Sequence, residues 1–353
     1  MSPRRIFSGQ GRFCCVGNGA RQCSSVPGGV YGTNWWTAVY AGAFLGIPGK
    51  TRYNWNPAAG CPLYPIRQHG QKGIPNRRMD YRMIALDLDG TLTDSRKEIP
   101  EPTLHALLEI QKQGFTVVLA SGRPTPGMTH LARKLHLEKY GGYLLSFNGA
   151  SITDCSAGRI IFEQTIPKPF IPGLYSFARE HETGLMTYHG DKIITGTRID
   201  KYMELEARIN HMTFKAVKDF PGYVDFNVSK CLLTGEPEHM AEAEILLKEK
   251  YGSELSIYRS EPFFLEVMPM NIDKAYSLQI LCGKIGLNKE QLISCGDGYN
   301  DLTMIRFAGL GVAMGNAQES VKSAADYVTA SNDNNGILKV IEKFIWGSAP
   351  APA

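Results

Sequence analysis

The chain has 353 residues, of which 43% are hydrophobic and 20% charged, a composition that suits a soluble globular protein with room for two compact domains. Its net charge of +4 is uneven, because residues 1–78 contain ten Lys and Arg and no Asp or Glu, whereas the rest contains 28 basic and 34 acidic residues. The apolar stretch from Trp35 to Ile47 is too short to span a bilayer and begins too late for a signal peptide, which excludes both there.

Residues 1–78 differ in character from the remainder. They show no sustained hydrophobic period of 3.6 or 2 residues, and the spacing of their four cysteines matches no zinc pattern. We expect a disordered or misassigned extension, with translation starting at Met79 and the protein acting in the cytoplasm. A targeting segment and a basic arm that binds nucleic acid or a protein partner remain open alternatives, although we expect neither nucleic acid nor a membrane as a partner.

The folded part begins with apolar strands that alternate with helices. The expected strands cover residues 83–88, 115–120 and 143–147, and the expected helices cover residues 101–113 and about 126–136. Gly114 marks the end of the first helix, as glycine often does. The alternation predicts a parallel sheet with helices on both faces.

The alternation is interrupted and then resumes. Residues 152–166 read as a hairpin with its turn at Ala157 and Gly158. Residues 170–268 mix helices around 174–182 and 238–251 with short strands at 192–195, 230–234 and 263–267. After that insert, we expect helices at 274–285, 301–308, 317–325 and 336–344 and strands at 292–295, 311–314 and 327–328.

These elements predict an α/β protein with a Rossmann-like, doubly wound parallel sheet. The catalytic core comprises residues 79–168 and 269–346, and an α+β cap domain of residues 169–268 is inserted into it. We expect the cap to fold over the site, to select the substrate and to move relative to the core. Its polar candidates for the substrate are Tyr188, His189, Arg198 and Lys230. Residues 347–353 should form a frayed tail.

Two carboxylates follow the first strand, where open parallel sheets bind their ligands. Asp87 and Asp89 can face the same way because side chains alternate along an extended chain, and Gly90 lets the backbone leave the strand sharply. Two adjacent carboxylates are costly to bury without a cation. They therefore imply a hard divalent ion, Mg²⁺ with its waters being the natural choice.

Three further elements fall after strands or at a helix start. Ser121 and Gly122 close the second strand and offer a hydroxyl and backbone N–H groups to an anion. Lys274 opens the helix after the insert and can reach an anion as a point charge. Asp297 and Asp301 add two carboxylates in a glycine-rich turn. Together these groups suit attack of a carboxylate on a phosphate, because such an attack needs its negative charge neutralised.

The segment from about Met79 to Trp346 resembles the haloacid dehalogenase-like hydrolases, specifically the Cof-type subfamily with the larger inserted cap. The resemblance covers four motifs, Asp87-Leu88-Asp89-Gly90-Thr91, Ala120-Ser121-Gly122-Arg123, Asp273-Lys274 and Gly296-Asp297-Gly298-Tyr299-Asn300-Asp301. It implies a phosphoric monoester hydrolase that uses Mg²⁺ and a phosphoaspartate and acts on a small phosphorylated metabolite.

The resemblance also implies a role for each matching residue. Asp87 is the expected nucleophile, and Asp89 the acid that protonates the leaving alcohol and later activates water. Ser121 is expected to hydrogen-bond the phosphate, and Lys274 to hold the nucleophile and the phosphoryl oxygens. The expected metal site comprises Asp87, Asp89 through its main-chain carbonyl, Asp297 and a supporting Asp301. The expected phosphate-binding positions are Thr91, Gly122, Asn148 and Asn300.

Two positions depart from the family's pattern. Ala275 stands where a glycine usually follows the lysine, and Asn271 stands where a glycine is common. Both residues are small or tolerate turns, so we expect a slight change in geometry and intact chemistry.

Two other functions remain open beside hydrolysis. A phosphomutase on the same core and cap would return the phosphate to another sugar oxygen, and phosphomannomutases resemble this chain from Asp87 to Thr93. A non-catalytic metabolite-binding module is disfavoured because all four motifs are present. Sugar phosphates, a flavin-pathway phosphate, pyridoxal phosphate and nucleotides all remain candidate substrates, and the sequence does not indicate the oligomeric state.

Overall fold

The computed structural model describes residues 53–54, 64–65 and 80–347. Within the basic segment it describes the two-residue strands β1 (Tyr53–Asn54) and β2 (Tyr64–Pro65), which pair antiparallel. The expectations for the rest of residues 1–78, and for the tail after residue 347, lie outside the described residues. No helix in the described part of the chain is both long and apolar enough to cross a membrane.

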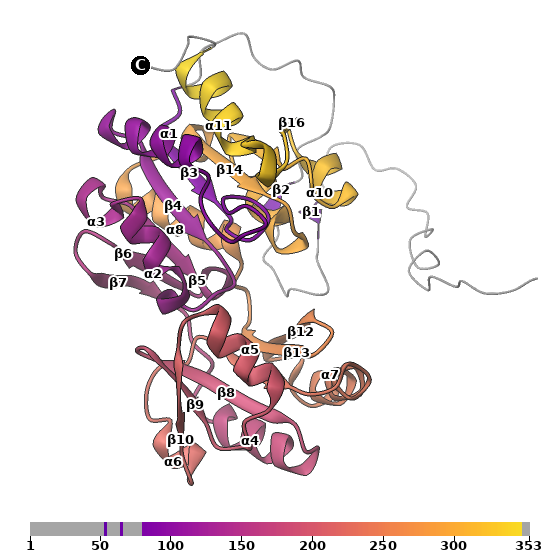
Figure 1. Cartoon of the computed structure of the whole chain (residues 1–353). Coiled ribbons are helices and arrows are strands. Elements are labelled where there is room, and N and C mark those ends of the chain that lie inside the picture. Colours follow the sequence, from indigo (N-terminus) through magenta and orange to yellow (C-terminus); the bar gives the residue numbers. More distant parts are fainter. Residues whose placement is uncertain (1–52, 55–63, 66–79, 348–353) are drawn as a thin grey trace, which may run out of the picture. The chain divides into compact units, whose positions relative to one another are not determined.

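Eight strands form the larger sheet, in the order β16-β15-β14-β3-β4-β5-β6-β7 (Figure 1). From β16 to β5 all neighbours are parallel, and β6 and β7 continue the sheet as an antiparallel hairpin. The strands are β3 (Met83–Leu86), β4 (Thr116–Ala120), β5 (Tyr143–Ser146), β6 (Ser151–Asp154), β7 (Arg159–Glu163), β14 (Leu292–Gly296), β15 (Leu310–Ala313) and β16 (Tyr327–Val328).

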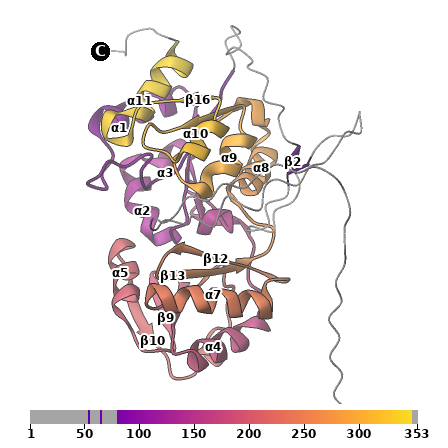
Figure 2. The same ribbon diagram turned by 90° about the vertical axis from the view of Figure 1, so that its right-hand side faces the viewer.

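Helices cover both faces of this sheet, and Figure 2 shows α1 and α2 on one side with α8 and α9 on the other. Side chains alternate along β3, so Ile84 packs with Leu107 of α1, whereas Met83 packs with Leu278 of α8. The helices are α1 (Glu101–Lys112), α2 (Thr125–Lys134), α3 (Leu137–Tyr140), α8 (Lys274–Ile285), α9 (Leu302–Phe307), α10 (Glu319–Ala324) and α11 (Gly336–Val340), which continues as a wider helical turn over Ile341–Trp346. The predicted doubly wound α/β fold is confirmed.

The insert forms a second sheet of six strands, in the order β10-β9-β8-β11-β13-β12. All its pairs are antiparallel except β10 with β9. Its strands are β8 (Gly184–His189), β9 (Lys192–Thr195), β10 (Thr213–Ala216), β11 (Cys231–Thr234), β12 (Leu255–Glu261) and β13 (Phe264–Pro269). Its helices are α4 (Phe170–Glu180), α5 (Lys201–Ile209), α6 (Phe220–Tyr223) and α7 (Pro237–Tyr251).

The two faces of this sheet have different neighbours. On one face, Leu233 packs with Leu174 of α4 and Leu247 of α7 in a common apolar cluster. On the other face, Leu232 belongs to a cluster that includes Met203 of α5 and Phe147, the residue after β5. The second face is therefore the one in apolar contact with the segment that follows β5 of the larger sheet.

Candidate active site

The segments that carry the four motifs meet at one edge of the larger sheet. β3 lies between β14 and β4 in parallel register, so the residues that follow these strands emerge at the same edge. Asp87 follows β3, Ser121 follows β4 and Asp297 follows β14. Lys274 is the first residue of α8, where the Asp273 carboxylate accepts a hydrogen bond from the Tyr276 N–H at 2.7 Å and fixes the helix start.

The turn after β3 is tight and depends on its glycine. The Leu92 N–H donates to the Asp87 carbonyl at 3.2 Å, and both the N–H and the hydroxyl of Thr93 donate to the Leu88 carbonyl. Gly90 has a φ of +82°, and a Cβ built there would lie 2.5 Å from Asp297 Oδ2. Only glycine fits this position without moving the Asp297 carboxylate.

A fully buried ammonium group joins two of the predicted acids. Lys274 Nζ donates to Asp87 Oδ1 at 2.6 Å and to Asp301 Oδ1 at 2.7 Å, and its side chain is 0% exposed. Burial opposes the charge of Lys274, but the two carboxylates outweigh it and raise the lysine pKa above its ordinary value. The structure therefore pairs Lys274 with the carboxylate of Asp87, the residue expected to be the nucleophile.

Asp301 and Asp297 are held by the turn that follows β14. Asp301 Oδ2 accepts hydrogen bonds from the backbone N–H groups of Asp297 at 3.0 Å and Gly298 at 2.9 Å. The Thr91 hydroxyl donates to Asp297 Oδ1 at 2.7 Å across 206 positions of sequence. Thr91 therefore orients the Asp297 carboxylate.

Three carboxylates gather where a cation would fit. Asp87, Asp297 and Asp301 each offer an oxygen, and these oxygens all lie within 4.8 Å of one another. Burial, and then the Asp301 charge, raise the pKa of Asp87 to about 8, and burial also raises the pKa of Asp297. One ammonium cannot balance three carboxylates, so this all-oxygen donor set fits a hard divalent cation.

The Asp89 carboxylate lies outside that cluster. Arg123 donates two hydrogen bonds to it, from Nε to Oδ2 at 2.8 Å and from Nη2 to Oδ1 at 2.7 Å. Lys97 Nζ donates a third to Oδ1 at 2.7 Å. Burial works to raise the pKa of Asp89, but these bonds from Arg123 and Lys97 hold it below its usual value. Arg123 belongs to the second motif but had no expected role, because only the fold brings it to Asp89.

The remaining predicted phosphate-binding residues lie in the segments that follow β4, β5 and β14. Ser121 is buried, and its hydroxyl accepts a hydrogen bond from the Arg123 N–H at 3.2 Å. A Cβ added at Gly122 would lie 3.2 Å from the Asn148 amide, and Asn148 Oδ1 accepts from Asn300 Nδ2 at 3.2 Å. These four residues form a connected polar rim.

The two departures from the family pattern fit their positions. Asn271 has a φ of +57°, a left-handed conformation that glycine favours and asparagine tolerates. Ala275 is fully buried in the first turn of α8, where its methyl group is accommodated directly after Lys274. Neither residue disturbs the ion pairs of that lysine.

Two of the four polar candidates of the insert, Lys230 and Tyr188, lie near this rim. Lys230 Nζ donates to the Gly122 carbonyl at 3.2 Å and lies 5.5 Å from the centre of the Tyr188 ring. His189 stacks on Phe226 instead.

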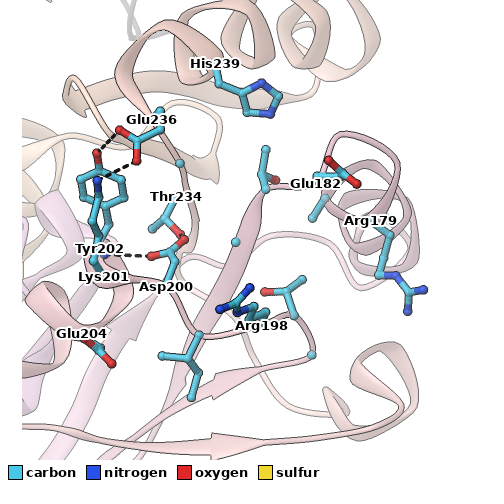
Figure 3. A pocket seen from close by; sticks show the side chains of 17 residues that line it. Arg179, Glu182, Arg198, Asp200, Lys201, Tyr202, Glu204, Thr234, Glu236 and His239 are labelled. Carbon is cyan, nitrogen blue, oxygen red and sulfur yellow. Dashed lines mark hydrogen bonds and ion pairs between the residues drawn. The ribbon is translucent and has the colours of Figure 1, made fainter.

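Arg198, the fourth candidate, lines a separate groove of about 990 Å³ on the insert (Figure 3). Two of its acids already have partners, since Asp200 accepts from the Tyr202 and Met203 N–H groups and Glu236 pairs with Lys201 at 2.7 Å. The groove contains none of the motif residues, so its size does not locate the active site.

Comparison with known proteins places the chain in a family. Residues 84–341 match the model of the haloacid dehalogenase-like hydrolases. A haloacid dehalogenase-like hydrolase from Bacteroides thetaiotaomicron has a similar structure, with a TM-score of 0.72 and 44% identity over 74% of this chain and 99% of that one. The subclass IIB sugar phosphatase BT4131 aligns with a TM-score of 0.64 and 26% identity over 74% of this chain and 98% of its own.

A curated relative adds an activity. The 5-amino-6-(5-phospho-D-ribitylamino)uracil phosphatase YcsE of Bacillus subtilis is 30% identical over 273 residues, which cover 77% of this chain and 99% of the relative. The match therefore extends over nearly the whole of that phosphatase. With the geometry of the acids and Lys274, these comparisons show that the chain belongs to the haloacid dehalogenase-like hydrolases and is a phosphatase.

Proposed function

We propose that this phosphatase depends on Mg²⁺ and hydrolyses phosphate monoesters of small hydroxylated metabolites through an aspartyl-phosphate on Asp87. The observation that carries the proposal is the buried Lys274 ammonium, 2.6 Å from Asp87 and 2.7 Å from Asp301, beside the Asp297 carboxylate. A buried carboxylate held by a lysine and next to a cation site is what nucleophilic attack on a phosphate requires.

Asp87 and Asp89 have different roles in the two steps of the proposed phosphoryl transfer. An Asp87 oxygen forms a bond to phosphorus as the bond from phosphorus to the leaving oxygen breaks. Asp89, which Arg123 and Lys97 hold in its charged form, takes up a proton when the substrate displaces those contacts and gives it to the leaving oxygen. Water then attacks the phosphorus of the acyl phosphate and gives a proton to Asp89, so that inorganic phosphate leaves and both carboxyl groups are restored.

Other groups stabilise the charge that builds on the phosphoryl group. Lys274 offsets the charge of Asp87, and the Ser121 hydroxyl with the Gly122 N–H can donate to phosphoryl oxygens. Mg²⁺, held by Asp87 and Asp297 with Asp301 in support, would supply Lewis-acid neutralisation of that charge. Asn148 and Asn300 complete the polar rim.

We further propose that residues 169–268 act as a cap over the core of residues 79–168 and 269–346. The two groups of residues form separate sheets, and the insert reaches the polar rim through Lys230. The named relatives act on a sugar phosphate and on a phosphorylated ribityl compound. Both substrates carry hydroxyl groups, which supports a hydroxylated leaving alcohol here.

A substrate panel with an active-site variant tests the proposal. The full chain with Mg²⁺ should release inorganic phosphate from phosphorylated polyols and sugars without forming isomers. The Asp87→Asn chain should keep the circular dichroism spectrum of the folded protein but release no phosphate. Turnover of this variant at a rate near wild type would remove Asp87 as the nucleophile.

A further inference from the structure

A buried ion pair lies on the face of the insert that meets the core. Lys230 directly precedes β11 and Glu266 lies on β13, and Leu232 is the partner of Glu266 in the antiparallel pairing of these strands. Lys230 is therefore diagonal to Glu266 on the same face. Lys230 Nζ lies 3.3 Å from Glu266 Oε1, and the two side chains are 3% and 6% exposed.

Both members of the pair contact the polar rim of the core. Lys230 Nζ donates to the Gly122 carbonyl at 3.2 Å. Glu266 Oε2 accepts from the Tyr258 hydroxyl at 3.0 Å and from Asn148 Nδ2 at 3.5 Å. Because Gly122 follows Ser121, and Asn148 accepts from Asn300 beside Asp301, the pair faces the loops that we propose bind the phosphate.

Burying such a pair is costly for a fold. The free energy lost when two charges leave water often exceeds the free energy gained from their attraction. Proteins that carry apolar side chains of similar volume in place of such a pair are often as stable or more stable. In the part of the chain that the structure describes, the other ion pairs with both side chains under 10% exposed are those of Lys274 with Asp87 and Asp301. Since we propose that this set serves the reaction, a role in binding the substrate would likewise account for the buried pair in the insert.

The pair presents a donor and an acceptor side by side. The ammonium of Lys230 can donate to one hydroxyl oxygen while the carboxylate of Glu266 accepts from the neighbouring hydroxyl, in place of the Gly122 carbonyl and the Asn148 amide. Such a matched pair favours adjacent hydroxyl groups, because an alcohol that displaces the Gly122 and Asn148 contacts but lacks a hydroxyl leaves Lys230 or Glu266 with one partner fewer. Because Glu266 offsets the charge of Lys230, a second anionic group on the substrate gains little from the lysine and is repelled by the carboxylate.

We propose that Lys230 and Glu266 determine specificity by recognising adjacent hydroxyl groups of the leaving alcohol and by rejecting an alcohol with a second negative charge. This inference rests on the proposed function, since it assigns the substrate class of the same site. The Tyr188 ring beneath the ammonium and the Tyr258 hydroxyl beside the carboxylate complete the surface that meets the alcohol.

Two substrates that differ at one carbon test the inference. Sorbitol 6-phosphate and 6-phosphogluconate share their other hydroxyl groups, but the first carbon is an alcohol in one and a carboxylate in the other. With Mg²⁺, the wild type should have the higher kcat/KM for sorbitol 6-phosphate. Glu266→Gln keeps the size and hydrogen bonding of the side chain, and it should lower that preference about tenfold, because one charged contact is worth about 10- to 100-fold.

The lysine gives a second readout. Lys230→Met should lower kcat/KM for sorbitol 6-phosphate by about 10- to 100-fold, and by a smaller factor for p-nitrophenyl phosphate, whose leaving group has no adjacent hydroxyls. Lys201→Met is the matched control, because Lys201 pairs with Glu236 on the same insert with 65% and 63% of their side chains exposed. The control should keep the wild-type ratio between the two substrates.

The outcomes separate this inference from the proposed function. If Glu266→Gln discriminates between sorbitol 6-phosphate and 6-phosphogluconate as the wild type does, while p-nitrophenyl phosphate is still hydrolysed in an Asp87-dependent way, the specificity role is wrong and the phosphatase mechanism stands. If the wild type with Mg²⁺ releases phosphate from none of the three compounds, the proposed function itself fails. Should Lys230→Met not fold, the Glu266→Gln ratio alone decides.

Discussion

At the scale of single residues, the site depends on buried charges that neutralise one another, because water does not reach them. Lys274 is fully buried and contacts both Asp87 and Asp301. Removing one partner from a buried charge cluster leaves the others uncompensated, which costs more than the loss of a surface pair. The same ammonium therefore supports both the fold and the proposed chemistry.

Lys274→Met should lower the free energy of unfolding by about 3–5 kcal/mol and lower kcat by about 100-fold or more, because a preorganised charge is lost. Denaturant unfolding and steady-state phosphate release would measure the two effects. Lys322→Met is the control, since Lys322 pairs with Glu319, a side chain that is 88% exposed, and should change stability by about 0.5 kcal/mol or less. Equal effects of the two substitutions would contradict the account.

Gly90 is a second residue whose role follows from geometry. Gly90→Ala would both hold alanine at a φ of +82° and place a Cβ 2.5 Å from Asp297 Oδ2. We expect a stability loss of about 1–2 kcal/mol from the backbone, together with weaker Mg²⁺ binding by calorimetry. Gly158→Ala has a φ of +62° and no atom within 4 Å, so it should show the stability loss alone. Unchanged Mg²⁺ affinity in Gly90→Ala would show that the turn does not position Asp297.

At the scale of elements, the sequence predicted the core better than the insert. Regular alternation of apolar strands with helices identified β3, β4 and β14, because strands buried on both faces are continuous apolar runs. The first strand ends at Leu86, two residues earlier than expected, because the chain turns at once to form the loop with Gly90. Boundaries of this kind depend on turn contacts that a hydrophobic pattern does not contain.

The insert shows why the rest could not be predicted. β12 begins with the buried Leu255 and Ile257 but ends in the polar run from Arg259 to Glu261, and β10 is mostly exposed, so the apolar pattern is short in β12 and weak in β10. α5 covers only nine residues, and its helical pattern is too short to stand out. The site acids were found because they follow strands, whereas Arg123, Lys97 and Glu266 acquire partners only through tertiary contacts.

The start of α5 carries a testable prediction. Asp200 accepts from the Tyr202 and Met203 N–H groups at 2.9 and 2.8 Å, and its other oxygen accepts from the Thr234 hydroxyl. Asp200→Ala should lower the free energy of unfolding by about 1–2 kcal/mol without changing turnover of p-nitrophenyl phosphate. Asp219 makes one such bond, to the Gly222 N–H, so Asp219→Ala should cost less. A smaller loss for Asp200→Ala than for Asp219→Ala would contradict this assignment.

At the scale of the whole molecule, the site draws its groups from distant parts of the sequence. Thr91 and Asp297 are 206 positions apart, and Asp87 and Lys274 are 187 positions apart. A cation bound by Asp87 and Asp297 would therefore join the first and last parts of the core. Because such a cation binds only the folded state, it stabilises that state by mass action.

Removal of metal should accordingly act on both activity and stability. Treatment with EDTA should abolish phosphate release, and added Mg²⁺ should restore it. A Mg²⁺ concentration of about 100 times its dissociation constant should raise the free energy of unfolding by about 2.7 kcal/mol, measured by denaturant unfolding. Asp297→Asn should lose most of this gain. Full activity and an unchanged unfolding curve after EDTA would exclude a divalent cation from the site.

The most direct measurement of the central claim is acid quenching of the enzyme during turnover, followed by mass spectrometry of its peptides. We expect a phosphoryl group on Asp87 that is labile to hydroxylamine and absent from the Asp87→Asn chain. A phosphoryl group on another residue would contradict it. Rapid turnover with no phosphorylated peptide and with inversion of configuration at phosphorus would also contradict it, because inversion indicates direct transfer to water in one step.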